Sequence, residues 1–263
     1  MQPIIKSTAD FSRHMDETGF CLFPKMVPEE LLARLRCDIP KRIELCREAA
    51  ERNGQGGGMN GAAHHVVGGN DSLADFLAGF YLDEYIATYF SGPYILNSYG
   101  AVNNLPAGGG YEHGLRFHRD VRTYSFPFRL MLNMLVMVDD FTYSNGATRV
   151  VPGSHRTPER PSDAILQKES VQVEGPAGSI LLFDSNIWHS AAPNRTARSR
   201  MALTLTLTRP FFKQQMDYPR LLGEEFPGSE KMRQLLGYNS RIPVSYDEWY
   251  QPPPRRMYRQ GQG

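Results

Sequence analysis

The sequence has almost no excess of charge of either sign. Lysine and arginine total 29 against 28 for aspartate and glutamate, so the formal net charge of the 263 residues is +1. A chain without a positive field has little means of gathering nucleic acid or an anionic membrane surface. We therefore expect a small-molecule partner, no nucleic acid and no membrane, and the oligomeric state stays open.

Cysteine and long apolar runs are also scarce. The three cysteines, Cys21, Cys37 and Cys46, are odd in number and show neither zinc-like spacing nor a disulfide framework. The N-terminus lacks a basic region followed by an apolar stretch, and Asn133 interrupts the longest apolar run, residues 130–138. We expect free thiols in a reducing compartment, neither secretion nor membrane insertion, and a cytoplasmic location.

The chain contains two regions with different residue patterns. Residues 1–93 have helical patterns at 28–53 and 71–90, separated by a glycine-rich stretch, 54–69, that is predicted to be a flexible loop. From residue 94 to about 210, short β-branched or aromatic runs alternate with glycine, proline and asparagine, which is typical of a barrel or sandwich.

A mixed extension, residues 211–263, follows the β-rich region and contains a predicted helix at 229–236. No repeat or linker divides the β-rich region. We therefore expect a single domain with a helical N-terminal part at about 1–93, a barrel core at about 94–210 and the C-terminal extension.

A His-X-Asp pair is the first candidate for chemistry. His118 and Asp120 lie two residues apart, so in an extended segment both side chains point to the same side. His189 ends a later strand, which a barrel can bring beside the pair. Two imidazoles and one carboxylate form the facial triad of non-haem Fe(II) oxygenases. The pair alone is a weak signal, because most such pairs are solvated surface groups or turn residues.

The strand after His189 adds a second signal. From Arg200 to Thr208 every second residue is arginine, alanine or threonine, and the residues between them from Leu203 to Leu207 are leucine. The polar face is predicted to line a barrel lumen, where a guanidinium needs a carboxylate such as the distal carboxylate of 2-oxoglutarate. Arg200 could instead pair with an internal acid or sit at a solvated strand end, and Arg198 has the same parity.

Four blocks in order make the resemblance specific. They are His-Arg-Asp at 118–120, Asn-Gly-Ala-Thr-Arg-Val-Val-Pro-Gly-Ser-His at 145–155, Gly-Ser-Ile-Leu-Leu-Phe at 178–183, and His-Ser-Ala-Ala-Pro-Asn at 189–194 followed by Arg200. Together they resemble the phytanoyl-CoA dioxygenase family, a branch of the Fe(II)/2-oxoglutarate oxygenases. The helical N-terminal part is similar too, whereas the residues after about 212 match no known pattern.

The resemblance implies a mainly β fold with flanking helices: a double-stranded β-helix, which is a jelly-roll or cupin-like barrel, with a helical N-terminal third. It implies that His118, Asp120 and His189 are the catalytic metal ligands for Fe(II), with 2-oxoglutarate and O2 as cosubstrates. The family places its 2-oxoglutarate arginine eleven residues after the distal histidine, which favours Arg200 over Arg198.

The activity that the resemblance implies is hydroxylation of an unactivated C–H bond of a metabolite, with release of succinate and CO2. Desaturation, epimerisation or ring formation would use the same ligands and stay open. Asp120 argues against a halogenase, which leaves the carboxylate position vacant for halide. A catalytically inactive barrel that binds a ligand is the alternative from another class.

Further site residues follow from position. Asn133 is an amide in an apolar strand and needs a partner; similar proteins use a polar residue of this strand to bind 2-oxoglutarate, although a structural hydrogen bond would serve equally. For substrate, the leading candidates are Arg122 and Tyr124, with Arg116 and His113 behind them. Surface salt bridges or loop packing explain these four at least as well.

Two segments are expected to form the substrate entrance and to become ordered only when substrate binds. They are the glycine-rich stretch 54–69 and residues 121–124, which follow Asp120 directly. By contrast, His155 in the Pro-Gly-Ser-His block is predicted to be a turn residue and not a ligand.

Overall fold

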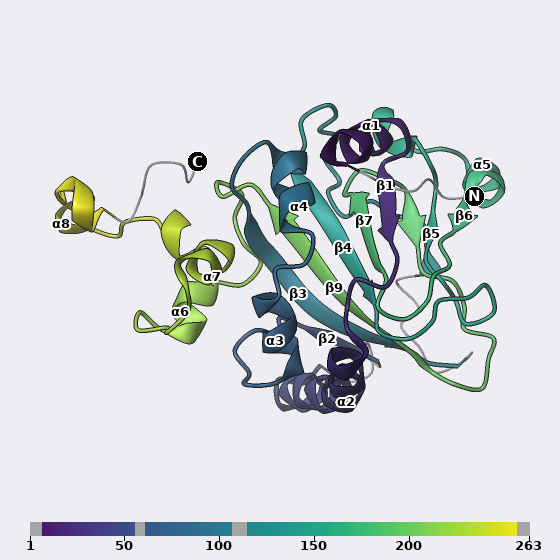
Figure 1. Cartoon of the computed structure of the whole chain (residues 1–263), viewed down its shortest axis with the longest axis horizontal. Coiled ribbons are helices and arrows are strands. Elements are labelled where there is room, and N and C mark those ends of the chain that lie inside the picture. Colours follow the sequence, from purple (N-terminus) through teal and green to yellow (C-terminus); the bar gives the residue numbers. More distant parts are fainter. Residues whose placement is uncertain (1–6, 56–60, 107–114, 257–263) are drawn as a thin grey trace.

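The computed structural model describes residues 7–55, 61–106 and 115–256 (Figure 1). Its centre is a six-stranded antiparallel sheet with the strand order β1-β7-β4-β9-β3-β2. In that order the strands are β1 (Phe20–Phe23), β7 (Ile180–Asp184), β4 (Met131–Met137), β9 (Arg200–Thr208), β3 (Ile95–Asn104) and β2 (Ala62–His64).

A smaller sheet faces the large one. Its three antiparallel strands are β6 (Val171–Gln172), β5 (Arg149–Val150) and β8 (His189–Ser190). Between the two sheets lies an inter-sheet core, whose larger members are Phe20, Leu135, Met137, Phe141, Leu181, Phe183 and Ile187. Two facing antiparallel sheets with apolar filling confirm the predicted mainly β fold.

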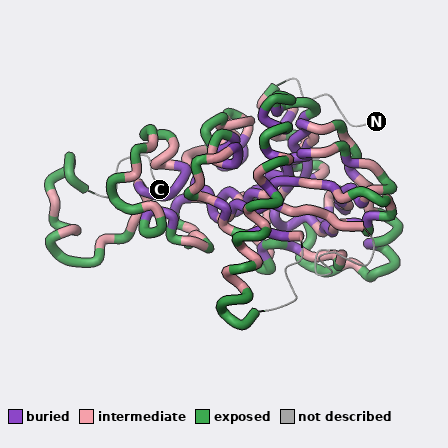
Figure 2. Tube along the Cα trace, turned by 90° about the horizontal axis from the view of Figure 1, so that it is seen from below, coloured by how far each residue is buried: buried purple, intermediate pink, exposed green. Residues whose placement is uncertain are grey.

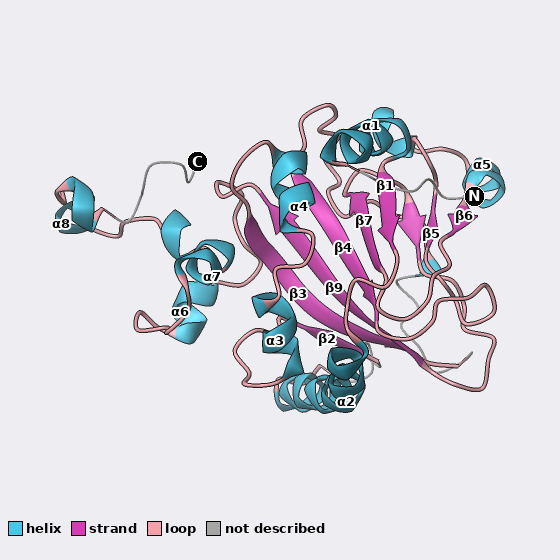
Figure 3. Cartoon of the chain, in the orientation of Figure 1, coloured by secondary structure: helices cyan, strands magenta, loops and turns pink. Residues whose placement is uncertain are grey.

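Helices cover the outer face of the large sheet (Figure 3). They are α1 (Thr8–Thr18), α2 (Glu29–Arg52), α3 (Ser72–Ala78) and α4 (Asp83–Phe90). Side chains of Ser7 and Asp71 cap α1 and α3, as their positions before helical patterns predict. Pro40 lies inside α2 without ending it.

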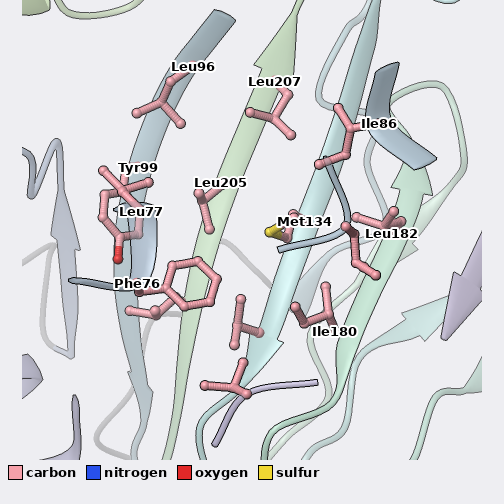
Figure 4. Packing of buried hydrophobic residues seen from close by; sticks show 14 of the residues in the cluster. Phe76, Leu77, Ile86, Leu96, Tyr99, Met134, Ile180, Leu182, Leu205 and Leu207 are labelled. Carbon is pink, nitrogen blue, oxygen red and sulfur yellow. The ribbon is translucent and has the colours of Figure 1, made fainter. Parts of the chain in front are cut away.

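Side chains of the central strands alternate between the two faces of the sheet, and each face contributes to a different hydrophobic core. Leu203, Leu205 and Leu207 of β9 point to the helices, where they pack with residues such as Met134 and Tyr99 in the larger core (Figure 4). Ala202 points the other way and joins the inter-sheet core. The period of two that the sequence shows in this strand therefore assigns its faces correctly.

Two expectations for the helical part were wrong in detail. The segment 71–90 is two helices, because α3 ends at Gly79 and Leu82, in the left-handed region at φ 61°, precedes α4. The break lets Phe76 of α3 and Ile86 of α4 both pack on the sheet. The stretch 54–69 is more than a loop, since it contains the edge strand β2 paired with β3; residues 56–60 lie outside the described residues.

The remaining helices are short. Helix α5 (Asp163–Glu169) precedes β6, and the C-terminal extension carries α6 (Tyr218–Leu222), α7 (Glu230–Leu235) and α8 (Tyr246–Trp249). Helix α7 lies where a helix was predicted. Single 3-10 turns are η2 (Ser154–Arg156), η3 (Tyr238–Ser240) and η4 (Pro253–Arg255). Burial decreases towards α8 (Figure 2), and no helix within the described ranges has the length and apolarity needed to span a membrane.

The central position of β9 yields a test of the fold. Leu205 is 4% exposed and packs in the core under the helices. Leu205→Ala should lower the free energy of unfolding by about 2–5 kcal/mol, because it removes buried methyl groups and leaves a cavity. Urea denaturation should show this loss, and Leu221→Ala, at a residue that is 52% exposed, should change stability by less than about 0.5 kcal/mol.

Candidate metal centre

A pair of backbone hydrogen bonds joins two segments that are far apart in the chain. The amide of His118 donates to the carbonyl of His189 at 2.9 Å, and the amide of His189 donates back to His118 at 3.0 Å. The amide of Asp120 donates to the carbonyl of Ser185 at 3.2 Å. These bonds extend the small sheet past β8 and fix the two segments in register.

The three predicted ligand side chains converge at this point. One ligand-type atom from each of His118, Asp120 and His189 lies within 4.8 Å of the others. His118 Nε2 is 3.5 Å from Asp120 Oδ1, and His189 Nε2 is 3.6 Å from Asp120 Oδ2. Two nitrogens and a carboxylate at these separations can contract onto a first-row divalent metal with small side-chain movements.

Backbone carbonyls orient both imidazoles. Nδ1 of His118 is 2.8 Å from the carbonyl of Arg116, and Nδ1 of His189 is 3.1 Å from the carbonyl of Ile187. A carbonyl oxygen only accepts, so each Nδ1 carries the proton and each Nε2 keeps its lone pair. Because both Nε2 atoms face Asp120, the tautomers suit metal ligation.

The electrostatics of the centre keep a negative charge on its carboxylate. Burial raises the pKa of Asp120, but the two nearby imidazoles and a hydrogen bond from Asn133 outweigh burial, and the pKa is lowered. Burial lowers the pKa of His189. Burial also opposes charge on His118, but the attraction of the Asp120 carboxylate and the hydrogen bond to the carbonyl of Arg116 raise its pKa. An ionised carboxylate beside a neutral buried imidazole is a suitable donor set for a divalent cation.

Asn133 has a partner that the sequence could not name. Its Nδ2 donates to Asp120 Oδ2 at 2.7 Å, and the side chain is buried. The amide thus holds the carboxylate in place, which corresponds to the structural alternative weighed for this residue, although the partner is a side chain instead of backbone. A contact between Asn133 and 2-oxoglutarate stays a prediction.

Arg200 is buried without a carboxylate. It is 4% exposed, its Nε donates to the carbonyl of Asn145 and one Nη to that of Gly146, both at 3.3 Å, and the guanidinium lies 3.7 Å from the ring centroid of Phe141. Burial lowers its pKa to about 10. No carboxylate in the described ranges forms an ion pair with it, so a buried positive charge there can receive an anionic ligand.

The remaining residues predicted to bind cosubstrate or substrate have surroundings unlike those of Arg200. Arg198 is exposed, as are Arg116 and Arg122, and these side chains are free to meet solvent. The hydroxyl of Tyr124 donates to the carbonyl of Arg156 at 2.7 Å, so its polar atom is already used. His113 lies outside the described residues.

Asn186 is a residue that the sequence analysis did not single out. Its Oδ1 accepts from the amide of Ser125 at 2.8 Å, and its Nδ2 donates to the carbonyls of Val121 and Thr123 at 3.1 and 3.3 Å. Asn186 therefore ties the segment after Asp120 to the turn that precedes His189, and the ordering of 121–124 on substrate binding stays a prediction. The signal in the sequence was an asparagine three residues before the distal histidine.

Arg119 was missed as well. It points away from the centre, between the two ligands of the His-X-Asp pair, and donates to the carbonyls of Ser154, Thr157 and Pro158. Its guanidinium lies 4.9 Å from the ring centroid of Trp188. His155 lies in η2, buried beside the ring of Phe126 and apart from the three converging residues.

A profile of a known family matches the chain over residues 15–202, under the description "Phytanoyl-CoA dioxygenase (PhyH)". Among similar proteins, "Uncharacterized protein Rv1501" of Mycobacterium tuberculosis is 43% identical over 149 residues, which cover 56% of this chain and 55% of that protein. "Dioxygenase FUM3" of Gibberella moniliformis is 28% identical, covering 56% of this chain and 51% of that protein. The chain spans about half the length of these relatives.

Solved structures share the fold at low identity. AviO1 from Streptomyces viridochromogenes superposes with a TM-score of 0.61 at 19% identity, covering 80% of this chain and 98% of that chain. SnoN, a non-haem α-ketoglutarate-dependent epimerase from nogalamycin biosynthesis, gives 0.60 at 16% identity, covering 77% and 83%. These superpositions confirm the predicted jelly-roll barrel.

The bond from Asn133 to Asp120 predicts a loss of metal affinity in Asn133→Ala. Partners that orient a ligand typically contribute about ten- to a hundred-fold in affinity, so calorimetric titration with Mn(II) or Fe(II) under anaerobic conditions should show a decrease of that order. Asn53→Ala, at an exposed amide after α2, should leave the affinity unchanged. Equal affinities of all three proteins would show that Asn133 does not position the carboxylate.

Asn186→Ala should loosen the segment that follows Asp120. The change leaves the amide of Ser125 and the carbonyls of Val121 and Thr123 without their buried partner, at a cost of about 1–3 kcal/mol. Hydrogen exchange followed by mass spectrometry should detect faster exchange in peptides that cover residues 121–126. Unchanged exchange there would mean that other contacts hold the segment.

Proposed function

The chain belongs to the phytanoyl-CoA dioxygenase family, and from that premise we propose that it is an Fe(II)- and 2-oxoglutarate-dependent dioxygenase that hydroxylates an unactivated C–H bond of a small molecule. The observation that carries the proposal is the convergence of three ligand-type side chains within 4.8 Å, in a barrel that also buries an unpaired guanidinium. The donor set fits the metal, and the arginine fits a dicarboxylate.

His118, Asp120 and His189 would hold the metal, with one carboxylate and two imidazole nitrogens as ligands. When bound, iron together with 2-oxoglutarate and O2 supplies the oxidising power for C–H cleavage, with release of succinate and CO2. The residues of the chain supply the rest. Backbone carbonyls fix the imidazole tautomers, and Asn133 fixes the carboxylate rotamer.

Arg200 would bind the distal carboxylate of 2-oxoglutarate. A guanidinium offers five donors, and the two protein carbonyls that it contacts leave others for a ligand. Its burial makes a charge-assisted pair strong, because little water competes for either partner. The ring of Phe141 covers one face of the guanidinium. A carboxylate would therefore approach the group in its plane, where the N–H donors point.

We propose hydroxylation in preference to desaturation, epimerisation or ring formation, because it is the simplest outcome of a reaction that uses the same ligands and cosubstrates in all four cases. The family relation supports a small-molecule substrate. We further propose that residues 1–263 form one domain, with the helices of the N-terminal part supporting the barrel. The residues that contact substrate would lie around the centre, with Arg122 and Arg116 as exposed candidates.

Purified protein should release succinate from 2-oxoglutarate in the presence of Fe(II), ascorbate and O2, even without substrate, at a low rate. Adding Fe(II) and 2-oxoglutarate together under anaerobic conditions should raise the melting temperature, because ligands of the native state stabilise it. An inactive binding barrel would show the melting shift without succinate. Absence of both responses would reject the proposal.

Arg200→Ala should raise the apparent KM for 2-oxoglutarate by about thirty-fold or more, because loss of a buried charge-assisted pair costs on the order of 2–5 kcal/mol. The matched control is Arg198→Ala, two residues earlier and exposed, which should stay within about two-fold of the wild type. The reverse result, with the loss in Arg198→Ala alone, would show that Arg200 is not the cosubstrate residue.

A further inference from the structure

The smaller sheet and its core cover only half of the inner face of the large sheet. Residues of β1, β4 and β7 supply most of the inter-sheet core from the large sheet, β9 supplies only Ala202, and no described residue of β2 or β3 takes part. On the other half, Ser98 of β3 and Thr204 and Thr206 of β9 are partly exposed, although both strands lie inside the sheet. This part of the inner face is free to contact a ligand.

His64 belongs to the same uncovered face. It pairs with Gly100 across β2 and β3, and Gly100 pairs with Thr204 across β3 and β9. Residues that pair directly across an antiparallel sheet point to the same side. The next pair, Ala63 and Ala101, lies in the core under the helices, so His64 points to the inner side.

The ring of His64 has no structural task within the described residues. Neither of its ring nitrogens makes a hydrogen bond there, and the residue reaches solvent although neighbouring atoms surround much of its ring. Only its carbonyl oxygen is used, by the thiol of Cys46. Its neighbour His65 differs, since Nδ1 of His65 is 3.3 Å from the hydroxyl of Tyr218. An imidazole on an inner barrel face without a partner is therefore available to a ligand.

The register places this face beside the candidate metal centre. Ser98 pairs with Thr206, Thr206 pairs with Asn133, and Asn133 contacts Asp120. His64 is three strands away from β4, which at about 4.8 Å between strands corresponds to about 14 Å. That separation is too long for a metal ligand. It suits a group that binds the far end of a molecule whose reacting bond lies near Asp120.

We propose that His64 is a substrate-binding residue, and that the partly exposed face of Ser98, Thr204 and Thr206 receives an uncharged compound that carries hydroxyl or carbonyl groups. The inference rests on the proposed function. It adds a specificity residue on β2 and a substrate class to that function. His64 hydrogen-bonds a polar group at the end of the substrate that is remote from the bond to be oxidised.

The chemistry of the face sets the class. Its side chains are hydroxyls, with Ser98 Oγ and Thr206 Oγ1 2.7 Å apart, whereas Gly100 between them and His64 is buried. Burial lowers the pKa of His64, which keeps the imidazole neutral at neutral pH. A neutral imidazole both donates and accepts, which suits hydroxyl and carbonyl groups better than the phosphates of a CoA thioester.

The test uses two compound sets with the full chain, Fe(II) and 2-oxoglutarate under anaerobic conditions. One set contains flavonoids, hydroxylated coumarins and aryl glycosides; the other contains medium-chain fatty acids and their CoA thioesters. The melting temperature should rise with members of the first set and not with the second. Stabilisation by the second set alone, or by neither, would overturn the proposed substrate class.

The compound with the largest shift is then titrated against variants of adjacent histidines. His64→Leu should weaken its binding by about ten-fold, His64→Gln should retain most of the affinity because an amide also donates and accepts, and His65→Asn should match the wild type. Equal affinity in His64→Leu and wild type would overturn the role of His64.

Failure of the inference and failure of the proposed function give different results. The shift produced by Fe(II) and 2-oxoglutarate alone, measured before any compound is added, tests the function. If that shift is present in wild type and in all three histidine variants, a negative result in the titrations concerns only His64 and the face beside it.

Discussion

Two backbone hydrogen bonds between His118 and His189 are the constraint on which the candidate centre depends. They join a segment without regular strand structure to a strand of only two residues, β8. Neither piece would hold a position alone. The large sheet, with its helices packed behind it, makes the rigid frame against which the small sheet and this bridge are fixed, and the burial of Phe183 against the ring of His189 links the two layers.

The charged groups around the centre differ in how many partners they have. Asp120 is held by Asn133 and by two imidazoles whose other nitrogens are bound to carbonyls. Among the described residues, Arg200 contacts two carbonyls and an aromatic ring but no carboxylate. Buried charges normally carry a counter-charge. Under the proposed function, the carboxylate held by Asn133 would mark the metal-binding end of the barrel, and the guanidinium without a counter-charge among the described residues would mark its anion-binding end.

The surface of the large sheet has three parts with different surroundings. Its outer face carries the helices, half of its inner face carries the small sheet, and the other half is lined by small hydroxylic residues and His64. The inner face is divided in this way because the large sheet has six strands and the small sheet that faces it has three. Beside the candidate centre, Asn186 and Arg119 bind backbone carbonyls of segments outside the strands, those of Val121 and Ser154.

The sequence by itself determined the local features. The period of two from Arg200 to Thr208 assigned each residue to a face, and the parity of His118 and Asp120 put both on one side, because side chains alternate along any extended chain. The helical pattern at 28–53 placed helix α2. These inferences need only neighbouring residues, and so the family resemblance and the local chemistry agreed with the structure.

Tertiary structure decided what depends on distant partners. Only the register between β4, β9 and the His-X-Asp segment makes Asp120 the partner of Asn133, and only the pairing of β2 turns part of a glycine-rich stretch into a strand that carries His64 to the inner face. The division of 71–90 into two helices likewise serves packing on the sheet. A pattern of residue types cannot specify these pairings, since each one is selected by the free energy of burying both partners together.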